Sequence, residues 1–265
     1  MEFMHANGVV LHYSDSGGDG PAIVFSNSLG TDFRIWDRVA PHFAATHRII
    51  RYDKRGHGLS EAPPAPYRMG DHVADLAALL DQRKVRGAVV VGLSVGGVIA
   101  QGLAAIRPGL VSALVLSNTA HKIGTTDSWN ARIAAVTSGG LGSIADAVMK
   151  LWFTPQFRDP ANAAFMGCRN MLVRTPVEGY AGTCAALRDA DMTDSTRALK
   201  LPVLCIAGDQ DGSTPPDLVR SMAELIGGSQ FRVVDDAGHI PCMEQPDAVV
   251  TLIRQFLRHI PHQDR

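Results

Sequence analysis

The residues best placed to do chemistry lie in a G-x-S-x-G pattern at positions 92–96, with Ser94 at its centre. Residues 88–91 before it are apolar and β-branched, which predicts a buried strand, and the apolar residues 98–106 after it predict a helix. A strand that turns at once into a helix crowds its backbone, and glycines beside the serine have no Cβ to clash. The pattern therefore predicts a nucleophile elbow, with the Ser94 hydroxyl held above the sheet at a strained turn.

Two other interpretations of this stretch are open. Residues 87–106 carry no charge, and about 20 such residues can cross a bilayer. Their glycines, Ser94 and Gln101 interrupt the hydropathy, and no aromatic belt flanks them, which argues against a membrane span. The pattern could also arise by chance, but its setting between a predicted strand and a predicted helix argues against chance.

A nucleophilic serine needs a base to take its proton and a carboxylate to orient that base. Residues 203–207 predict a buried strand, and the loop after it contains two acids, Asp209 and Asp211. Residues 231–235 predict the next strand, and His239 follows in the loop after it. Both loops come after predicted strands, in the order acid and then histidine, and either acid could orient His239.

The pattern of predicted elements indicates an α/β fold. Apolar strands alternate with amphipathic helices, which favours a mostly parallel central sheet with helices on both faces. From about residue 121 to 191 the alternation stops, and four helices are predicted with no strand between them. We expect residues 1–120 and 192–265 to form the core and residues 121–191 to form a helical cap, or lid. The predicted strands are 9–14, 22–26, 48–53, 88–91, 113–118, 203–207 and 231–235, and the predicted helices are 69–82, 98–106, 128–136, 143–153, 161–173, 176–188, 216–226 and 247–258.

Composition excludes several classes of protein. The 265 residues are 46% hydrophobic and 19% charged, as in a globular protein, and a net charge of −1 offers no basic field for nucleic acid or anionic lipid. Residues 1–5 lack the features of a signal peptide, so we expect a cytoplasmic protein. No H-E-x-x-H pattern is present, and we expect neither a metal nor a disulfide. The cysteines are scattered and are expected to be buried thiols: Cys168, Cys184, Cys205 and Cys242.

Taken together, the three motifs resemble those of the α/β-hydrolase superfamily over nearly the whole chain. The family's acid loop is similar to G-x-x-D-x-x-x-P, which matches residues 208–215 with Asp211 as the acid. Asp209 is then a turn residue that binds nearby N–H groups. The resemblance implies that Ser94 is the nucleophile, that His239 is the base, and that His57, in a D-x-R-G-x-G stretch, is structural.

An oxyanion formed at such a serine must be met by two N–H groups. The resemblance implies that one comes from Val95, directly after the nucleophile. The other should come from the loop after strand 22–26, where many relatives carry His-Gly-X with X as the donor. This chain has Asn27, Ser28 and Leu29 there, so Leu29 is the matching donor.

A closer resemblance, carried mainly by the cap, is to the 3-oxoadipate enol-lactonases, which hydrolyse the enol-lactone of 3-oxoadipate in bacterial breakdown of protocatechuate and catechol. It implies a small anionic lactone as the partner and no cofactor. Trp129, Arg132 and Trp152 are expected to contact the substrate. Trp129 and Arg132 share a helix face, where the guanidinium could grip a carboxylate, although the pair could also pack together on the cap surface. The segments that carry this resemblance are 118–125, 129–133, 152–155, 175–180 and 187–191.

Other functions remain open at this point. A different carboxylesterase, or a hydrolase of carbon–carbon bonds in ring-fission products, would use the same three residues. A non-catalytic small-molecule receptor can share the fold, because fold alone does not fix function. The complete set of Ser94, Asp211 and His239 favours catalysis over simple binding.

Overall fold

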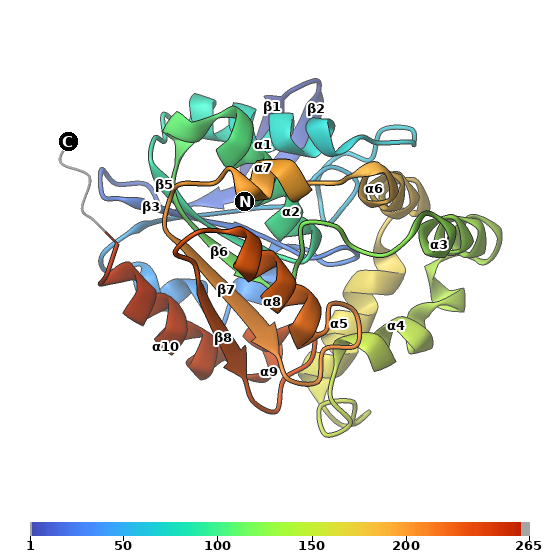
Figure 1. The fold of residues 1–265 in the computed structure, drawn as a ribbon. Coiled ribbons are helices and arrows are strands. Elements are labelled where there is room, and N and C mark those ends of the chain that lie inside the picture. Colours follow the sequence, from blue (N-terminus) through green and yellow to red (C-terminus); the bar gives the residue numbers. More distant parts are fainter. Residues whose placement is uncertain (1, 261–265) are drawn as a thin grey trace.

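The computed structural model describes residues 2–260, which are organised around one eight-stranded sheet (Figure 1). The strand order is β1-β2-β4-β3-β5-β6-β7-β8. The pairs β1/β2 and β2/β4 are antiparallel, and every other neighbouring pair is parallel. The strands are β1 (Glu2–Ala6), β2 (Val9–Asp15), β3 (Ala22–Ser26), β4 (Arg48–Tyr52), β5 (Ala88–Leu93), β6 (Val111–Ser117), β7 (Val203–Gly208) and β8 (Gln230–Val234).

The central parallel strands are covered on both faces, as parallel sheets usually are. All residues of β3, β5 and β7 are buried, so their solid runs of valine, isoleucine, leucine and alanine face helices or connecting segments on either side. Helices lie on both sides of the sheet in Figure 1. The main core helices are α1 (Met69–Gln82), α2 (Val95–Ile106), α8 (Pro216–Leu225) and α10 (Pro246–Leu257).

The strand register brings the carboxyl ends of five parallel strands to one edge. The ends of β3, β5, β6, β7 and β8 are joined by pairs such as Ser26 with Gly92, Leu93 with Ser117 and Gly208 with Val234. The loops that follow these strands therefore leave the sheet close together. In open α/β sheets this edge is where ligands bind.

Between β6 and β7 the chain contains helices and no strand (Figure 1). The helices α3 and α6 pack against each other, and α4 packs on α5. This stretch coincides with the predicted cap; that it acts as a separate lid stays a prediction. The helices are α3 (Thr126–Gly139), α4 (Ala145–Trp152), α5 (Ala163–Arg174), α6 (Val177–Asp189) and α7 (Thr193–Arg197).

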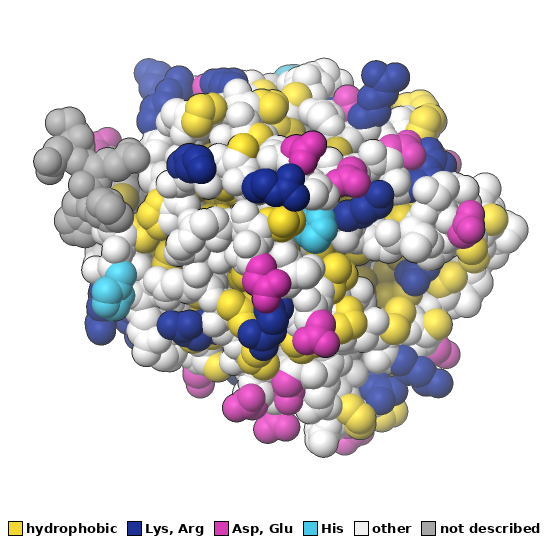
Figure 2. Space-filling view, in the orientation of Figure 1, with side chains coloured by type: hydrophobic (Ala, Val, Ile, Leu, Met, Phe, Trp, Pro, Cys, Tyr) yellow, Lys and Arg dark blue, Asp and Glu magenta, His cyan; other side chains and the backbone are white. Residues whose placement is uncertain are grey.

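The predicted α/β class, with a mostly parallel sheet, is confirmed. Among the strands and α-helices, three were not predicted: β1, which pairs with β2 along the sheet edge, the short polar helix α7, and the four-residue helix α9 (Pro241–Glu244). Within residues 2–260, no helix is both long and apolar enough to span a membrane. All four cysteines are buried free thiols. On the face seen in Figure 2, acidic and basic side chains are both present, and several acidic side chains lie together at the lower edge.

Candidate active site

Ser94 occupies the sharp turn between β5 and α2. Its backbone has φ 57° and ψ −120°, a conformation that non-glycine residues adopt only when the surroundings enforce it. The Ser94 N–H donates to the Ser117 carbonyl at 3.0 Å, and the Thr119 hydroxyl donates to the Ser94 carbonyl at 2.7 Å. The end of β6 thus fixes the strained residue from both sides of its backbone.

The glycines around Ser94 are required by close approach. A Cβ at Gly92 would lie 2.6 Å from the Gly97 Cα and would also collide with the Gly96 carbonyl. A Cβ at Gly96 would collide with the backbone of Ser26, at the end of β3. The elbow therefore folds only because both flanking positions lack a side chain.

Asp211 and His239 are paired at the same edge of the sheet. The His239 Nδ1 lies 2.9 Å from one Asp211 carboxylate oxygen and 3.1 Å from the other. The carboxylate also accepts the Ser213 and Thr214 N–H groups, at 2.7 and 3.0 Å, the Thr214 hydroxyl at 2.7 Å and the Asn118 amide at 2.9 Å. These hydrogen bonds hold the Asp211 carboxylate in one orientation against the imidazole ring of His239.

The environment of Asp211 keeps it ionised. Burial raises its pKa, but the neighbouring His239 and the hydrogen bonds from His239, Asn118 and the Thr214 N–H hold the pKa below its ordinary value. Asp209, the competing acid, instead accepts the Ala237 N–H at 3.0 Å, as a turn residue does. Of the two acids, only Asp211 bonds to His239 among the described residues.

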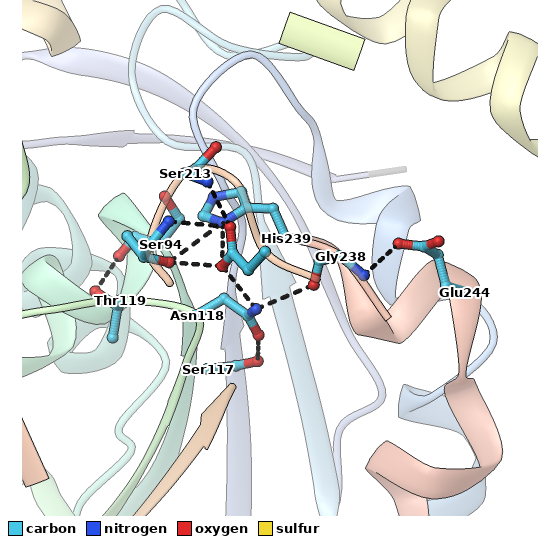
Figure 3. A network of polar contacts seen from close by, with 10 residues as sticks. Ser94, Ser117, Asn118, Thr119, Ser213, Gly238, His239 and Glu244 are labelled. Carbon is cyan, nitrogen blue, oxygen red and sulfur yellow. Dashed lines mark hydrogen bonds and ion pairs between the residues drawn. The ribbon is translucent and has the colours of Figure 1, made fainter. Parts of the chain in front are cut away.

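Sequence reasoning gave no role to Asn118, yet its side chain connects the three loops. It donates to Asp211 and, at 3.1 Å, to the Gly238 carbonyl directly before His239. Its neighbours on either side, Ser117 and Thr119, hold Ser94. Figure 3 shows the contact of Thr119 with Ser94 and, beside it, the contacts of Asn118 with Ser117 and with Gly238, next to His239. The one available signal was its position directly after an apolar strand.

His239 is also anchored to the cap. The backbone N–H of His239 donates to the Trp152 carbonyl at 2.7 Å. The Trp152 ring stacks on the imidazole at a centroid distance of 6.5 Å. Glu244, another residue missed from sequence, accepts the Gly238 N–H at 2.7 Å and the Thr154 hydroxyl at 2.7 Å. The histidine loop and the end of α4 are therefore joined by backbone and side-chain bonds.

The two backbone N–H groups expected to bind the oxyanion are buried and have no protein acceptor among the described residues. Leu29 is 6% exposed and Val95 is fully buried. Within residues 2–260, neither backbone N–H donates to a protein acceptor. Buried N–H groups are almost always paired, so these two unpaired N–H groups are available for a ligand oxygen.

Of the seven Lys and Arg residues between positions 121 and 191, three form ion pairs, and four, Arg132 among them, have no carboxylate partner among the described residues. Lys122, Arg169 and Arg188 form ion pairs with Asp191, Asp146 and Asp189. Arg132, on α3, has no carboxylate partner among the described residues. Its guanidinium donates instead to the Tyr180 hydroxyl on α6 at 3.1 Å.

Tyr180 and Trp152 reach the loop that carries Leu29. A methyl group placed on Gly30 would lie 3.1 Å from the Tyr180 ring, 3.4 Å from the Trp152 ring and 2.6 Å from Leu172. Gly30 has φ 70°, so both its backbone and its surroundings require glycine. Trp152 therefore touches both the histidine and the oxyanion loop, and Arg132 reaches the same region through Tyr180.

Trp129 has a structural contact of its own, and its expected contact with the substrate stays a prediction. Its indole N–H donates to the Ile123 carbonyl at 2.7 Å and so closes the turn before α3. No cation–π contact joins it to Arg132 among the described residues. His57 is fully buried behind the site, and no cluster of histidine, cysteine or acidic side chains suited to a metal occurs within residues 2–260.

Comparison with known proteins agrees with this geometry. A family model described as alpha/beta hydrolase fold matches residues 21–246. The chain is 38% identical over 244 residues to 3-oxoadipate enol-lactonase 2 of Acinetobacter baylyi, covering 92% of this chain and 91% of that protein. For 3-oxoadipate enol-lactonase 1 of the same organism the identity is 33%, with 91% and 90% covered. The crystal structure of the enol-lactonase from Burkholderia xenovorans LB400 superposes with a TM-score of 0.94 at 35% identity, over 97% of this chain and 100% of that chain. Both predicted resemblances are confirmed.

Proposed function

The chain belongs to the alpha/beta hydrolase fold family and is an enzyme of that family, and we propose that it opens the ring of 3-oxoadipate enol-lactone to give 3-oxoadipate. The observation that carries this proposal is the similarity to two enol-lactonases, which spans both the core and the cap. Breakdown of aromatic compounds is the context that this substrate implies, and a cytoplasmic location stays a prediction.

We propose acyl transfer to Ser94 as the first step. His239, oriented by Asp211 at 2.9 Å, takes the proton of the Ser94 hydroxyl as that oxygen attacks the lactone carbonyl. The negative charge that forms on the carbonyl oxygen is met by the N–H groups of Leu29 and Val95. Both donors are already buried and unpaired, so little reorganisation accompanies the attack.

Collapse of this intermediate opens the ring. The bond between the carbonyl carbon and the ring oxygen breaks, and His239 returns its proton to the departing enol oxygen. Because the leaving group stays attached to the acyl chain, the product of this step is an acyl-enzyme on Ser94. His239 then takes a proton from water, whose oxygen attacks the ester carbon and releases the diacid and the free serine. The freed enol can tautomerise to the ketone, which makes ring opening hard to reverse.

We propose that Arg132 and Trp152 select the substrate. The lactone carries an acetate side chain, and Arg132 is a cap guanidinium without a carboxylate partner among the described residues. A guanidinium can bind a carboxylate through two parallel hydrogen bonds. Trp152 would form an apolar wall, because its ring lies against both His239 and Gly30.

The test is turnover by the purified protein of the enol-lactone and of a neutral aryl ester of similar size. We expect loss of the lactone chromophore at a higher kcat/KM than ester cleavage, and loss of both activities after treatment with a serine-reactive phosphonate. Ester cleavage without lactone turnover would indicate a different carboxylesterase. No turnover of either substrate would refute the proposed reaction.

A further inference from the structure

A buried lysine lies directly behind the loop that carries Leu29. Lys54 follows β4 and is fully buried. Its ammonium donates to the Ser28 carbonyl at 2.6 Å and to the Asn27 carbonyl at 3.4 Å. No carboxylate lies within ion-pair distance of it among the described residues. Burying an ammonium without a counter-ion is costly, so its place in the fold calls for an explanation.

The Ser28 carbonyl and the Leu29 N–H belong to the same peptide group. That group is planar and trans, so its N–H points away from the carbonyl and from Lys54. A charged donor on the carbonyl draws electron density from the amide and strengthens the N–H as a donor. An anionic oxygen bound by Leu29 would lie about 7 Å from the ammonium across this single peptide. The interior screens charge weakly, so the ammonium would also act through its field.

Neutral groups already hold this carbonyl in place. The Thr31 hydroxyl donates to the Ser28 carbonyl at 2.9 Å, and the Thr31 N–H donates to it at 3.3 Å. The loop therefore has two neutral contacts at this carbonyl besides the contact with Lys54. What Lys54 adds to these contacts is its positive charge.

The groups around Lys54 leave its charge uncompensated. Asp53 is the nearest acid in sequence, but it accepts from His12 and from the N–H groups of Phe33 and Leu59. Asp32, on the facing loop, is bonded to Arg34, and two buried histidines, His57 on the same loop and His72 on α1, also feel the lysine charge. Burial lowers the pKa of Lys54 to about 7, against the smaller opposing effects of Asp53 and Asp32.

We infer that Lys54 is a positioning residue for the reaction, whose ammonium polarises the Ser28–Leu29 peptide and strengthens its N–H toward the oxyanion. This inference rests on the proposed role of Leu29 and not on the identity of the lactone. When Lys54 loses its proton, the Leu29 N–H keeps its place but loses part of its strength. Catalysis should therefore weaken as pH rises through the pKa of Lys54, about 7.

The experiment compares three variants with the wild type on a neutral aryl ester. Lys54→Met removes the charge, Lys54→Arg keeps a charge that does not titrate, and Thr31→Val removes a neutral donor from the same carbonyl. Removing one oxyanion donor costs roughly 10²–10³ in kcat, so we expect Lys54→Met to cost roughly ten- to a hundredfold in kcat with little change in KM. Thr31→Val should cost less and keep the wild-type pH profile.

The pH profile separates this role from a merely structural one. Wild-type kcat should fall with an apparent pKa of about 7 on its alkaline side. That limb should be absent in Lys54→Met and should move to higher pH in Lys54→Arg, with activity largely restored. An alkaline limb that persists unchanged in folded Lys54→Met would overturn the inference, as would equal losses in Lys54→Met and Thr31→Val.

Wild-type protein supplies a measurement that needs no variant. Phosphonylation of Ser94 by an uncharged aryl phosphonate places a developing anionic oxygen at the same donors. Its rate should fall with pH in step with kcat, and a rate that keeps rising above about pH 8 would contradict the inference. Failure to open the enol-lactone would refute the proposed substrate while leaving these aryl-ester and phosphonate results intact.

Discussion

The carboxyl edge of the sheet and the helical cap hold their charged groups in opposite ways. At the sheet edge, Asp211 is 4% exposed and its two oxygens accept from four different residues. In the cap, the side chains of the ion pair Lys122 and Asp191 are 54% and 49% exposed. An ion pair exposed to this extent contributes little to stability. Arg132 has no ion pair among the described residues, and its guanidinium donates instead to the hydroxyl of the buried Tyr180.

This difference separates two tasks. A buried, fully bonded network fixes the positions of reacting groups, which is what bond cleavage requires. Surface ion pairs leave a cap free to vary, so choice among esters depends on the few cap groups that face inward. On this account the core determines whether an ester bond is cut, and the cap determines which ester enters.

The largest effect should come from the core nucleophile. Ser94→Ala should lower kcat by roughly 10⁴-fold or more, as loss of the nucleophile does in other serine triads. Stability should change little, because a strained turn residue contributes little packing. Steady-state kinetics and a thermal melt measure both. Activity within tenfold of wild type would show that Ser94 is not the nucleophile.

The two acids of the loop after β7 test the core in a matched pair. Asp211→Asn should leave His239 poorly oriented and lower kcat by roughly 10³–10⁴-fold. Asp209→Asn, the control, loses only part of a turn contact with Ala237 and should have a much smaller effect. If the two variants exchanged these effects, Asp209 would be the orienting acid.

The cap should show a smaller, selective effect. Arg132→Met should remove a charged hydrogen bond of about 1.5–3 kcal/mol, or roughly 10- to 150-fold in kcat/KM for the anionic lactone. A neutral ester should lose little. Arg188→Met is the matched control, because Arg188 also links α6 to α3, through Asn130, but is ion-paired with Asp189. Equal losses in both variants would point to a weakened cap.

The pH dependence of stability should show the same contrast between regions. The pKa of Lys54 is lowered from 10.5 to about 7 in the fold, so between these values the unfolded chain binds more protons. The free energy of unfolding should therefore rise with pH in this window, by at most about 1.4 kcal/mol per pH unit. Denaturant midpoints near pH 7, 8 and 9 should show this rise in wild type and lose it in Lys54→Met. The exposed-pair variant Arg188→Met should keep the wild-type slope.

The sequence was sufficient for most of the fold and for the geometry of the candidate site. Each of the three motifs follows an apolar strand, and the carboxyl ends of those parallel strands meet at one edge, so Ser94, Asp211 and His239 could be expected together. The strands and main helices were located to within a few residues, because apolar runs and amphipathic patterns mark them in the sequence. The catalytic roles of Ser94, Asp211 and His239 stay predictions.

The rest depends on packing that no local pattern encodes. Asn118 meets Asp211 across 93 residues of chain. Lys54 is a charged residue, which would ordinarily be expected at the surface. Arg132 meets Tyr180 only because α3 packs on α6. The edge strand β1 has no β-branched residue, and α7 is short and polar, so neither carries a strong pattern.

One ratio tests the division between core and cap most directly: kcat/KM for the enol-lactone divided by kcat/KM for the neutral ester. It should be measured side by side in wild type, Asp211→Asn and Arg132→Met. We expect Asp211→Asn to lower both activities and leave the ratio near the wild-type value, and Arg132→Met to lower the ratio by roughly 10- to 150-fold. A ratio that changes as much in Asp211→Asn as in Arg132→Met, or that changes in neither, would contradict the account.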